Sequence, residues 1–372
     1  MKNNTAFKQF LEQTDFVFLS MCGLCSGISV CAIYAIYKTM NAIESPKVAL
    51  VQLLASLAGI AIAILLSIID YKELCEWFQF HSAAVYLLMI LTAFIGFAPP
   101  GTTNKAWIAL PFGLSLQPSE LLKISMIITL AHFLDKYHDS IDEINVMAKL
   151  VGIALIPFAF VAFQKDGGTM LVYALIIASM FFAAGVSWKL VGMGIGGAFI
   201  LSPILWWKMG DYQKNRILAL FNPDSPEFKT ILDQQNSGEI SIGSGQLFGK
   251  GFFANNHNAV PLPQNDFMFS FLAESVGFIG TILLICLILA IAFRILSISQ
   301  RSVDLQGSYI CVGVFAMLIF QSIINIGMNL TVLPVIGITL PLFSAGGTSV
   351  VATYCAIGLV LSVARHNKKS LF

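Results

Sequence analysis

Long uncharged stretches alternate with short polar segments along the whole chain. A helix that crosses a bilayer needs about 20 apolar residues, because the hydrocarbon core is about 30 Å thick. The pattern predicts ten such helices: residues 16–37, 48–69, 80–97, 118–134, 150–163 (extended back to about 146), 168–184, 190–207 and 267–293, and two more within the uncharged stretch 305–364, where Pro334 and Pro341 mark a loop. We expect an all-α polytopic membrane protein.

Composition supports this fold class. Of the 372 residues, 57% are hydrophobic and 11% are charged, with a mean hydropathy of +0.81. Soluble domains average about 25% charged residues, so a soluble enzyme is excluded. Disorder is excluded as well, because it requires low hydrophobicity and high net charge. The formal net charge of +1 argues against a nucleic-acid partner. We expect residues 1–372 to form one integral membrane domain.

Lysine and arginine in the short connections predict the orientation, because these residues concentrate on the cytoplasmic side. If the N-terminus is inside, the inner segments hold Lys2, Lys8, Lys72, Lys136, Lys149, Lys189, Arg294, Arg301, Arg365, Lys368 and Lys369, and the outer short loops hold only Lys38, Lys47, Lys105 and Lys165. Both termini are therefore expected in the cytoplasm. The first apolar stretch is too long for a cleaved signal peptide and lacks a small-residue cleavage pattern.

A long polar segment, residues 208–266, separates the seventh and eighth predicted helices and falls outside in this orientation. Structureless loops longer than about 12–15 residues are usually functional or disordered. This segment contains five phenylalanines and the glycine-rich run Ile242–Gly251, so it is not low-complexity. We expect a partly ordered extracytoplasmic element on the membrane surface, with a solvated tether as the alternative.

Four acidic residues are predicted at membrane depth: Glu120, Asp166, Asp266 and Glu274. An ionisable residue there costs at least about 2.5–3.5 kcal/mol on insertion scales, so each marks a candidate functional site. The first three open predicted helices at the outer face, and Glu274 lies about two turns deeper than Asp266. Glu120 and Lys123 are three residues apart on one helix face, where they can pair.

Two of the predicted helices begin with residues suited to a ligand. In Gln117-Pro-Ser-Glu120, proline fits the first turn, and Ser119 and Glu120 suit free N–H groups. Ser344-Ala-Gly-Gly-Thr-Ser349 opens the tenth helix on the same face, where backbone N–H donors suit an anion such as a diphosphate. Capping alone and close packing of glycine are the simpler interpretations of these two motifs.

Five motifs, taken in order, carry a resemblance to a known family. They are Gln117-Pro-Ser-Glu-Leu-Leu-Lys123; Arg216 with Phe221-Asn-Pro-Asp224; Ile242–Gly251; Leu262-Pro-Gln-Asn-Asp-Phe-Met-Phe269 with Ala273-Glu274; and Leu333-Pro-Val-Ile-Gly-Ile-Thr-Leu-Pro341 with Ser344–Ser349. Over nearly its whole length the chain resembles the SEDS family (RodA, FtsW and SpoVE), whose members act in shape, elongation, division and sporulation.

The resemblance implies a peptidoglycan glycosyltransferase that polymerises lipid II at the outer face of the bacterial cytoplasmic membrane, in cell wall synthesis. It implies a class B penicillin-binding protein as partner, which cross-links the nascent glycan. Other proteins of the elongation or division complex and membrane lipid are further implied partners. The motifs do not distinguish a RodA-like from an FtsW-like or SpoVE-like protein.

The resemblance also assigns residues by position. Asp266 corresponds to the family's essential acidic residue, and Glu120, Lys123 and Asp166 correspond to polar groups of its cavity. The remaining expected substrate-binding residues are Trp107, Gln117, Ser119, Arg216, Ser344, Gly346, Gly347 and Thr348. The chain departs from the family pattern at residues 164–169 and at Asn265, Ala273 and Ala345, while every essential acidic residue is present.

In the implied reaction, the 4-hydroxyl of one sugar attacks the anomeric carbon of a lipid-linked diphosphate sugar with inversion. Asp266 is the expected general base. His257 is the rival because imidazole titrates near neutral pH, although a surface histidine is the simpler interpretation. Charge on the departing diphosphate would be offset by a cation: Lys123, Arg216, Lys105 or a divalent Mg²⁺ or Mn²⁺ ion. Trp107 would stack on a sugar or lie in the interfacial aromatic belt.

Two other classes of function fit part of the pattern. A transporter that flips a lipid-linked precursor would also contain buried charges and broken helices, but its charges would spread through the membrane depth and its halves would form an inverted repeat. The charges here gather at one face. A non-catalytic scaffold would leave the cost of Glu120, Asp166 and Asp266 unexplained.

Overall fold

The computed structural model describes residues 14–40, 42–43, 45–98, 104–111, 114–222, 225 and 228–367. Its elements in chain order are α2 (Phe16–Thr39), α3 (Lys47–Ile68), α4 (Tyr71–Glu76), α5 (Phe78–Ile95), β1 (Ile108–Ala109), β2 (Ser115–Leu116), α6 (Pro118–Lys136), α7 (Ile144–Phe163), α8 (Gly167–Ala183), α9 (Trp188–Lys208), α10 (Asp211–Phe221), α11 (Lys229–Ser244), α12 (Met268–Gln300), α13 (Leu305–Asn329) and α14 (Gly347–His366). The two strands form an antiparallel hairpin in which Ile108 pairs with Leu116.

Each of the ten predicted membrane helices coincides with a helix of the structure. Within the described residues, seven helices are long and apolar enough to cross a bilayer: α2, α3, α5, α7, α12, α13 and α14. The other three predicted spans coincide with α6, α8 and α9, of which α8 is apolar but only 17 residues long. The all-α polytopic membrane fold is confirmed, and the count of ten spans stays a prediction.

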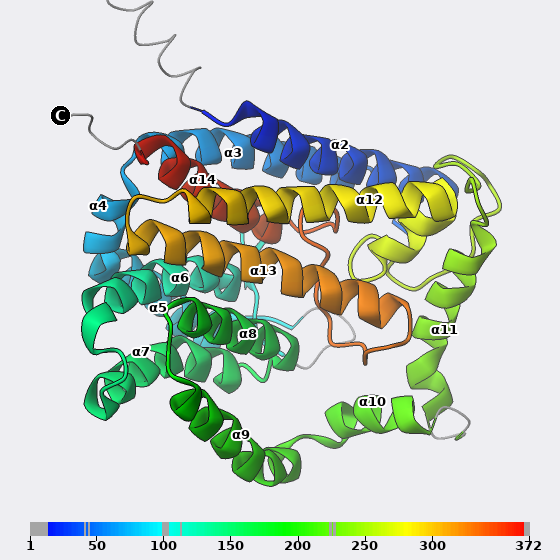
Figure 1. The fold of residues 1–372 in the computed structure, drawn as a ribbon. Coiled ribbons are helices and arrows are strands. Elements are labelled where there is room, and N and C mark those ends of the chain that lie inside the picture. The colour runs from blue at the N-terminus through cyan, green and yellow to red at the C-terminus, as the bar shows by residue number, and fades with distance from the viewer. Residues whose placement is uncertain are drawn as a thin grey trace, which may run out of the picture.

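Small residues allow the central helices to approach closely. The most extensive helix–helix contact joins α3 to α14. An added Cβ would lie 2.6 Å from Tyr354 at Gly59, and 2.8 Å from Ala63 at Gly358. Membrane helices associate through such close packing, because lipid supplies no hydrophobic driving force between them. α12 and α13 run side by side across the same bundle (Figure 1).

Three helices, α9, α10 and α11, form an arm outside this bundle (Figure 1). The arm passes along one side of the bundle and then along its end before the chain returns to α12. Two helices therefore lie within residues 208–266, which confirms that this segment is partly ordered. Its placement outside the cell and on the membrane surface stays a prediction.

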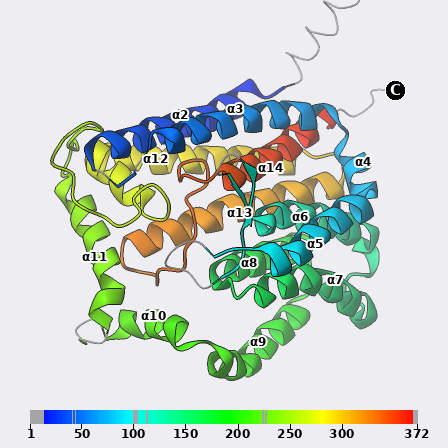
Figure 2. The ribbon, with the colours of Figure 1, turned by 180° about the vertical axis from the view of Figure 1, so that it is seen from behind.

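The start of α2 and the end of α14 lie together at the end of the bundle opposite α11 (Figure 2). Both ends of the described chain are thus on one side of the bundle. This arrangement is what the predicted topology requires, since an even number of spans returns the chain to the side where it began. Which side faces the cytoplasm stays a prediction.

Helix α12 is interrupted at Gly277, whose φ of 70° lies in the left-handed region that glycine tolerates. The backbone of residues 246–251 fills the break. The Phe278 N–H donates to the Gln246 carbonyl at 2.7 Å, and an added Cβ at Gly249 would collide with the backbone of α12. The glycine-rich run of the sequence therefore packs into the break and supplies carbonyl acceptors for the backbone N–H groups that the break leaves without helical partners.

Glu274 lies one turn before this break and is fully buried. Its carboxylate accepts a hydrogen bond from Lys250 Nζ at 2.6 Å. It also accepts bonds of 2.8–3.0 Å from Ser241, Ser244 and Asn258. The deeper acidic residue of the sequence is thus the anchor that ties residues 241–258 to the first turns of α12.

His257 belongs to this anchor. Its Nδ1 lies 3.1 Å from the Glu274 carboxylate, its side chain is fully buried, and its ring centroid lies 4.9 Å from that of Phe271. The expectation of a surface histidine is therefore wrong. Its signal in the sequence was weak, because the partner carboxylate is seventeen residues away and in another element.

We expect Glu274→Ala to destabilise the protein by about 3–5 kcal/mol, because the substitution leaves Lys250 and several buried donors without their acceptor. The measurement is thermal unfolding of the purified protein in detergent. Glu239→Ala removes an exposed glutamate from α11 and is the matched control, with an expected change within about 0.5 kcal/mol. Equal unfolding temperatures for the two variants would contradict the anchoring role.

Candidate active site

The first two turns of α6 carry a buried ion pair. Lys123 Nζ donates to Glu120 Oε1 at 2.8 Å, and the two residues are 1% and 7% exposed. Pro118 opens the helix, and the three-residue spacing puts both side chains on one face. The pairing predicted from the spacing is confirmed. Both charges are shielded from solvent, so each depends on the other for its stability.

Asp166 caps the N-terminus of α8. Its carboxylate accepts bonds from the Thr169 N–H at 3.0 Å and the Thr169 hydroxyl at 2.8 Å. Gln117 Nε2 approaches the same carboxylate at 3.4 Å from the start of α6. Burial raises the pKa of the Asp166 carboxyl, and Glu120 raises it further. Asp166 therefore lies within the electrostatic field of the α6 ion pair.

Asp266 immediately precedes α12 and is fixed through its backbone. Its carbonyl accepts bonds of 3.0 Å from Asn325 Nδ2 and Asn329 Nδ2, one turn apart on α13. The carboxylate faces Gly337, where an added Cβ would lie 3.8 Å from Oδ2. Burial raises the pKa of the Asp266 carboxyl to about 6; the Arg216 guanidinium opposes this shift and Asp166 adds to it.

Arg216 comes from α10, in the arm, and is half-buried. Its Nη1 donates to the Val335 carbonyl at 2.5 Å. This bond connects the arm to the loop between α13 and α14, the same loop that contains Gly337 beside Asp266. The guanidinium is thereby held within electrostatic reach of the Asp266 carboxylate.

The start of α14 is held by a polar side chain from α3. Gln52 donates to the Ser344 carbonyl at 3.1 Å and accepts from the Gly346 N–H at 3.2 Å. Ser344 Oγ donates to the Asn265 carbonyl at 2.6 Å, next to Asp266. Thr348 Oγ1 accepts from the Gln117 N–H at 3.3 Å. The tenth predicted helix start is therefore joined to both α6 and the Asp266 loop.

The structure brings most of the predicted site residues into one region. Asp266 lies within electrostatic reach of Arg216 and Asp166. Asp166 in turn lies within electrostatic reach of Glu120 and Lys123. The N-termini of α6, α8 and α14 converge here, with Gly168 packed directly against the Ile336 carbonyl. Helix N-termini carry partial positive charge, so this region suits an anion.

The other predicted residues differ in how accessible they are. Ser119, Ser344 and Thr348 are buried, at 0%, 3% and 8% exposure, so they face protein more than solvent. Gly346 and Gly347 are half-buried. Trp107 is half-buried beside the β1–β2 hairpin, where its backbone pairs with Phe97. Lys105 is exposed.

Three polar residues that shape this region were missed in the sequence: Gln52, Asn325 and Asn329. Each is nearly fully buried in a helix that otherwise reaches membrane-crossing hydropathy. The signal was present, because an amide inside an apolar span needs a partner. The four-residue spacing of Asn325 and Asn329 also puts both amides on one helix face.

A divalent cation finds few protein ligands here. Across the described ranges, no three His, Cys, Asp or Glu residues lie close enough together to hold a metal ion. Mg²⁺ is often held by one or two carboxylates together with substrate phosphates. A Mg²⁺ or Mn²⁺ ion at this region would therefore need the substrate diphosphate as its main ligand.

The chain has clear relatives. The family described as "Cell cycle protein" (FtsW, RodA and SpoVE) matches residues 12–369. The peptidoglycan glycosyltransferase MrdB of Escherichia coli K12 is 32% identical over 292 residues, which cover 76% of this chain and 77% of MrdB. Stage V sporulation protein E of Bacillus subtilis 168 is 30% identical over 356 residues, which cover 93% and 94% of the two chains.

Solved structures share the fold. A chain from a peptidoglycan synthase complex that coordinates polymerization and crosslinking has a TM-score of 0.80 and 25% identity, covering 95% of this chain and 98% of its own. The rod shape determining protein RodA of Thermus thermophilus has a TM-score of 0.71 and 26% identity, covering 96% and 98%. The chain described here belongs to the FtsW/RodA/SpoVE family.

Proposed function

We propose that this protein is a peptidoglycan glycosyltransferase that polymerises lipid II into glycan strands at the outer face of the bacterial cytoplasmic membrane. The relative MrdB is named a peptidoglycan glycosyltransferase. The observation that carries the proposal is the position of Asp266. Its carboxylate is partly buried, lies within reach of the Arg216 guanidinium, and borders the region where three helix N-termini meet.

Asp266 acts as the general base in this proposal. Burial raises the pKa of its carboxyl to about 6, which lies close to the working pH and suits a base. The carboxylate takes the proton from the 4-hydroxyl of one disaccharide while that oxygen bonds to the anomeric carbon of a lipid-linked diphosphate sugar. The bond from that carbon to the diphosphate oxygen breaks on the opposite face, so the configuration inverts.

The departing diphosphate needs cations more than a proton, because it is already a good leaving group. Arg216 supplies one positive charge, and Lys123 adds a second that Glu120 holds in place at 2.8 Å. The N-termini of α6, α8 and α14, including the N–H groups near Gly346 and Gly347, add partial positive charge. Asp166 orients Gln117 and sugar hydroxyls.

The remaining residues position this set or bind sugar. Ser344 and Thr348 connect α14 to the Asp266 loop and to α6. Ser119 lies in the same first turn of α6, where the Tyr173 hydroxyl donates to its carbonyl at 2.6 Å. Trp107 is the aromatic surface for a sugar ring. Each of these roles is part of the proposal.

A class B penicillin-binding protein is the proposed partner. Support comes from the synthase complex that contains a chain of this fold and coordinates polymerization with crosslinking. We further propose that both termini face the cytoplasm, that residues 208–266 lie outside, and that other elongation or division proteins join the assembly. The charge distribution of the short loops supports this orientation.

Asp266→Asn tests the base. The substitution keeps the shape but removes the proton acceptor, so we expect lipid II polymerisation to fall about 10²–10⁴-fold. The assay uses purified protein in detergent with its partner and lipid II, and measures glycan length. Asp233→Asn changes an exposed aspartate of α11 and is the control with unchanged rate.

Polymerisation at the wild-type rate by Asp266→Asn would remove Asp266 from the chemistry. Absence of polymer from wild type, together with lipid II transfer across liposomes, would favour a flippase.

The pH profile provides a second test. The raised pKa of Asp266 means that the base form is lost as the pH falls through about 6, so kcat/KM is expected to decline tenfold per pH unit below that point. Arg216→Gln removes the cation that lowers this pKa, so the acid limb of the variant should move to higher pH. A limb that stays in place in Arg216→Gln would separate Arg216 from the titrating base.

A further inference from the structure

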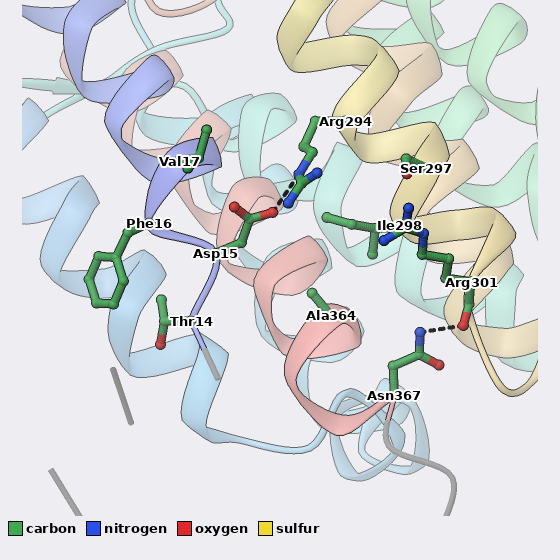
Figure 3. Close-up of a pocket in the computed structure, with 10 residues that line it drawn as sticks. All are labelled: Thr14, Asp15, Phe16, Val17, Arg294, Ser297, Ile298, Arg301, Ala364 and Asn367. Carbon is green, nitrogen blue, oxygen red and sulfur yellow. Dashed lines mark hydrogen bonds and ion pairs between the residues drawn. The ribbon is translucent and has the colours of Figure 1, made fainter. Parts of the chain in front are cut away.

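A second candidate site lies at the other end of α12 from Asp266. A cavity of about 460 Å³ is bounded by the start of α2, the last turns of α12 and the end of α14 (Figure 3). This volume is within the range of small-molecule sites, about 300–1,000 Å³. Nothing in the proposed polymerisation uses this cavity.

Two arginines of α12 line the cavity. Arg294 and Arg301 are seven residues apart, which is close to two full helical turns, so both lie on one helix face with Ser297 between them. Figure 3 shows both guanidinium groups on the side of α12 that faces Asp15. A helix face with two cations and a hydroxyl offers several donors to one anion.

The cavity has an excess of positive charge. Arg294 Nε pairs with Asp15 at 2.6 Å. Arg301 has no carboxylate within ion-pair distance among the described residues; its backbone N–H donates to the Ile298 carbonyl, and its backbone carbonyl accepts from Asn367. The lining therefore holds two guanidinium groups against one carboxylate, a net charge of +1.

The sequence of α12 predicts that the cavity lies at the depth where hydrocarbon meets water. α12 carries no charge from Ser275 to Phe293, and Arg294 is the first ionised residue after that stretch. Phe16 and Val17 line the same cavity and are 40% and 65% exposed. Apolar side chains next to arginines at a membrane boundary match a molecule with an acyl part and an anionic head.

We propose that this cavity binds the phosphate of an anionic phospholipid, such as phosphatidylglycerol. Arg301 and Ser297 donate to the phosphate, Arg294 shares its guanidinium between the phosphate and Asp15, and Phe16 and Val17 contact the glycerol and acyl region. The bound lipid joins α2, α12 and α14 at their common end. The proposal is independent of the proposed function and would hold for an inactive protein.

The test uses the protein in phosphatidylcholine nanodiscs with increasing phosphatidylglycerol. Thermal unfolding reports stabilisation, because a ligand that binds only the native state raises its stability. Native mass spectrometry counts the retained phosphatidylglycerol. For wild type we expect a rise in unfolding temperature with phosphatidylglycerol and one retained molecule. Arg301→Gln should need about fivefold more phosphatidylglycerol for half of that rise.

Two further variants keep the result specific. Asp15→Asn releases Arg294 from its ion pair while an amide still caps α2, so phosphatidylglycerol should bind more tightly than to wild type. If Asp15 only stabilised the fold, Asp15→Asn would instead weaken the binding of phosphatidylglycerol. Lys189→Gln removes one exposed positive charge outside the cavity and should behave as wild type.

The outcomes separate the possible ligands. An equal dependence on phosphatidylglycerol in wild type and Arg301→Gln would overturn the site. An Arg301-dependent stabilisation by inorganic phosphate, in nanodiscs of phosphatidylcholine alone and at constant ionic strength, would overturn the lipid as the ligand. The proposal expects no such stabilisation, because free phosphate makes no contact with Phe16 and Val17.

Discussion

Every backbone amide and carbonyl that leaves a helix inside this bundle needs a partner from the protein, because hydrocarbon offers none. The active region is built where helices stop: α6, α8, α12 and α14 all begin there. Buried polar side chains supply these partners: Gln52 at the start of α14, and Asn325 and Asn329 at the residue before α12. Asp166 caps α8, and Thr348 accepts from the Gln117 N–H before α6. The same side chains that bond the backbone at these helix ends also position the site. Asn325 and Asn329 bond the Asp266 carbonyl, and the Asp266 carboxylate faces Gly337.

The helices and much of the site follow from local patterns. Span positions depend on hydropathy over about 20 residues, and the Glu120–Lys123 pair depends on a three-residue spacing, so both were predictable. The contacts of Glu274 were not predictable, because Lys250 and His257 reach its carboxylate only where the chain packs into the break in α12. The roles of Gln52 and Asn325 were hidden for the same reason: their partners lie in another element, as with Gln52 and Ser344.

Low exposure to solvent strengthens the electrostatic interactions of the charged side chains in the active region. Glu120 holds the Lys123 ammonium in place within α6, and the Asp166 carboxylate accepts from Thr169 in the first turn of α8. Asp266 has the Arg216 guanidinium within electrostatic reach, but among the described residues its carboxylate accepts no hydrogen bond comparable to those that Thr169 donates to Asp166. Burial raises the pKa of the Asp266 carboxyl to about 6. A carboxyl with a pKa in this range suits the proton abstraction proposed for Asp266.

The break at Gly277 divides α12 into two rods with different mechanical neighbours. The shorter rod, which follows Asp266, is bonded through Glu274 to the segment 241–258 and hence to α11. The longer rod contains Arg294 and ends at Gln300, next to Arg301. The direction of the shorter rod is therefore set by its hydrogen bonds to residues 241–258 rather than by the axis of the longer rod. Because Asp266 immediately precedes the shorter rod, its position depends on the polar contacts of Glu274 more than on the long helix that follows.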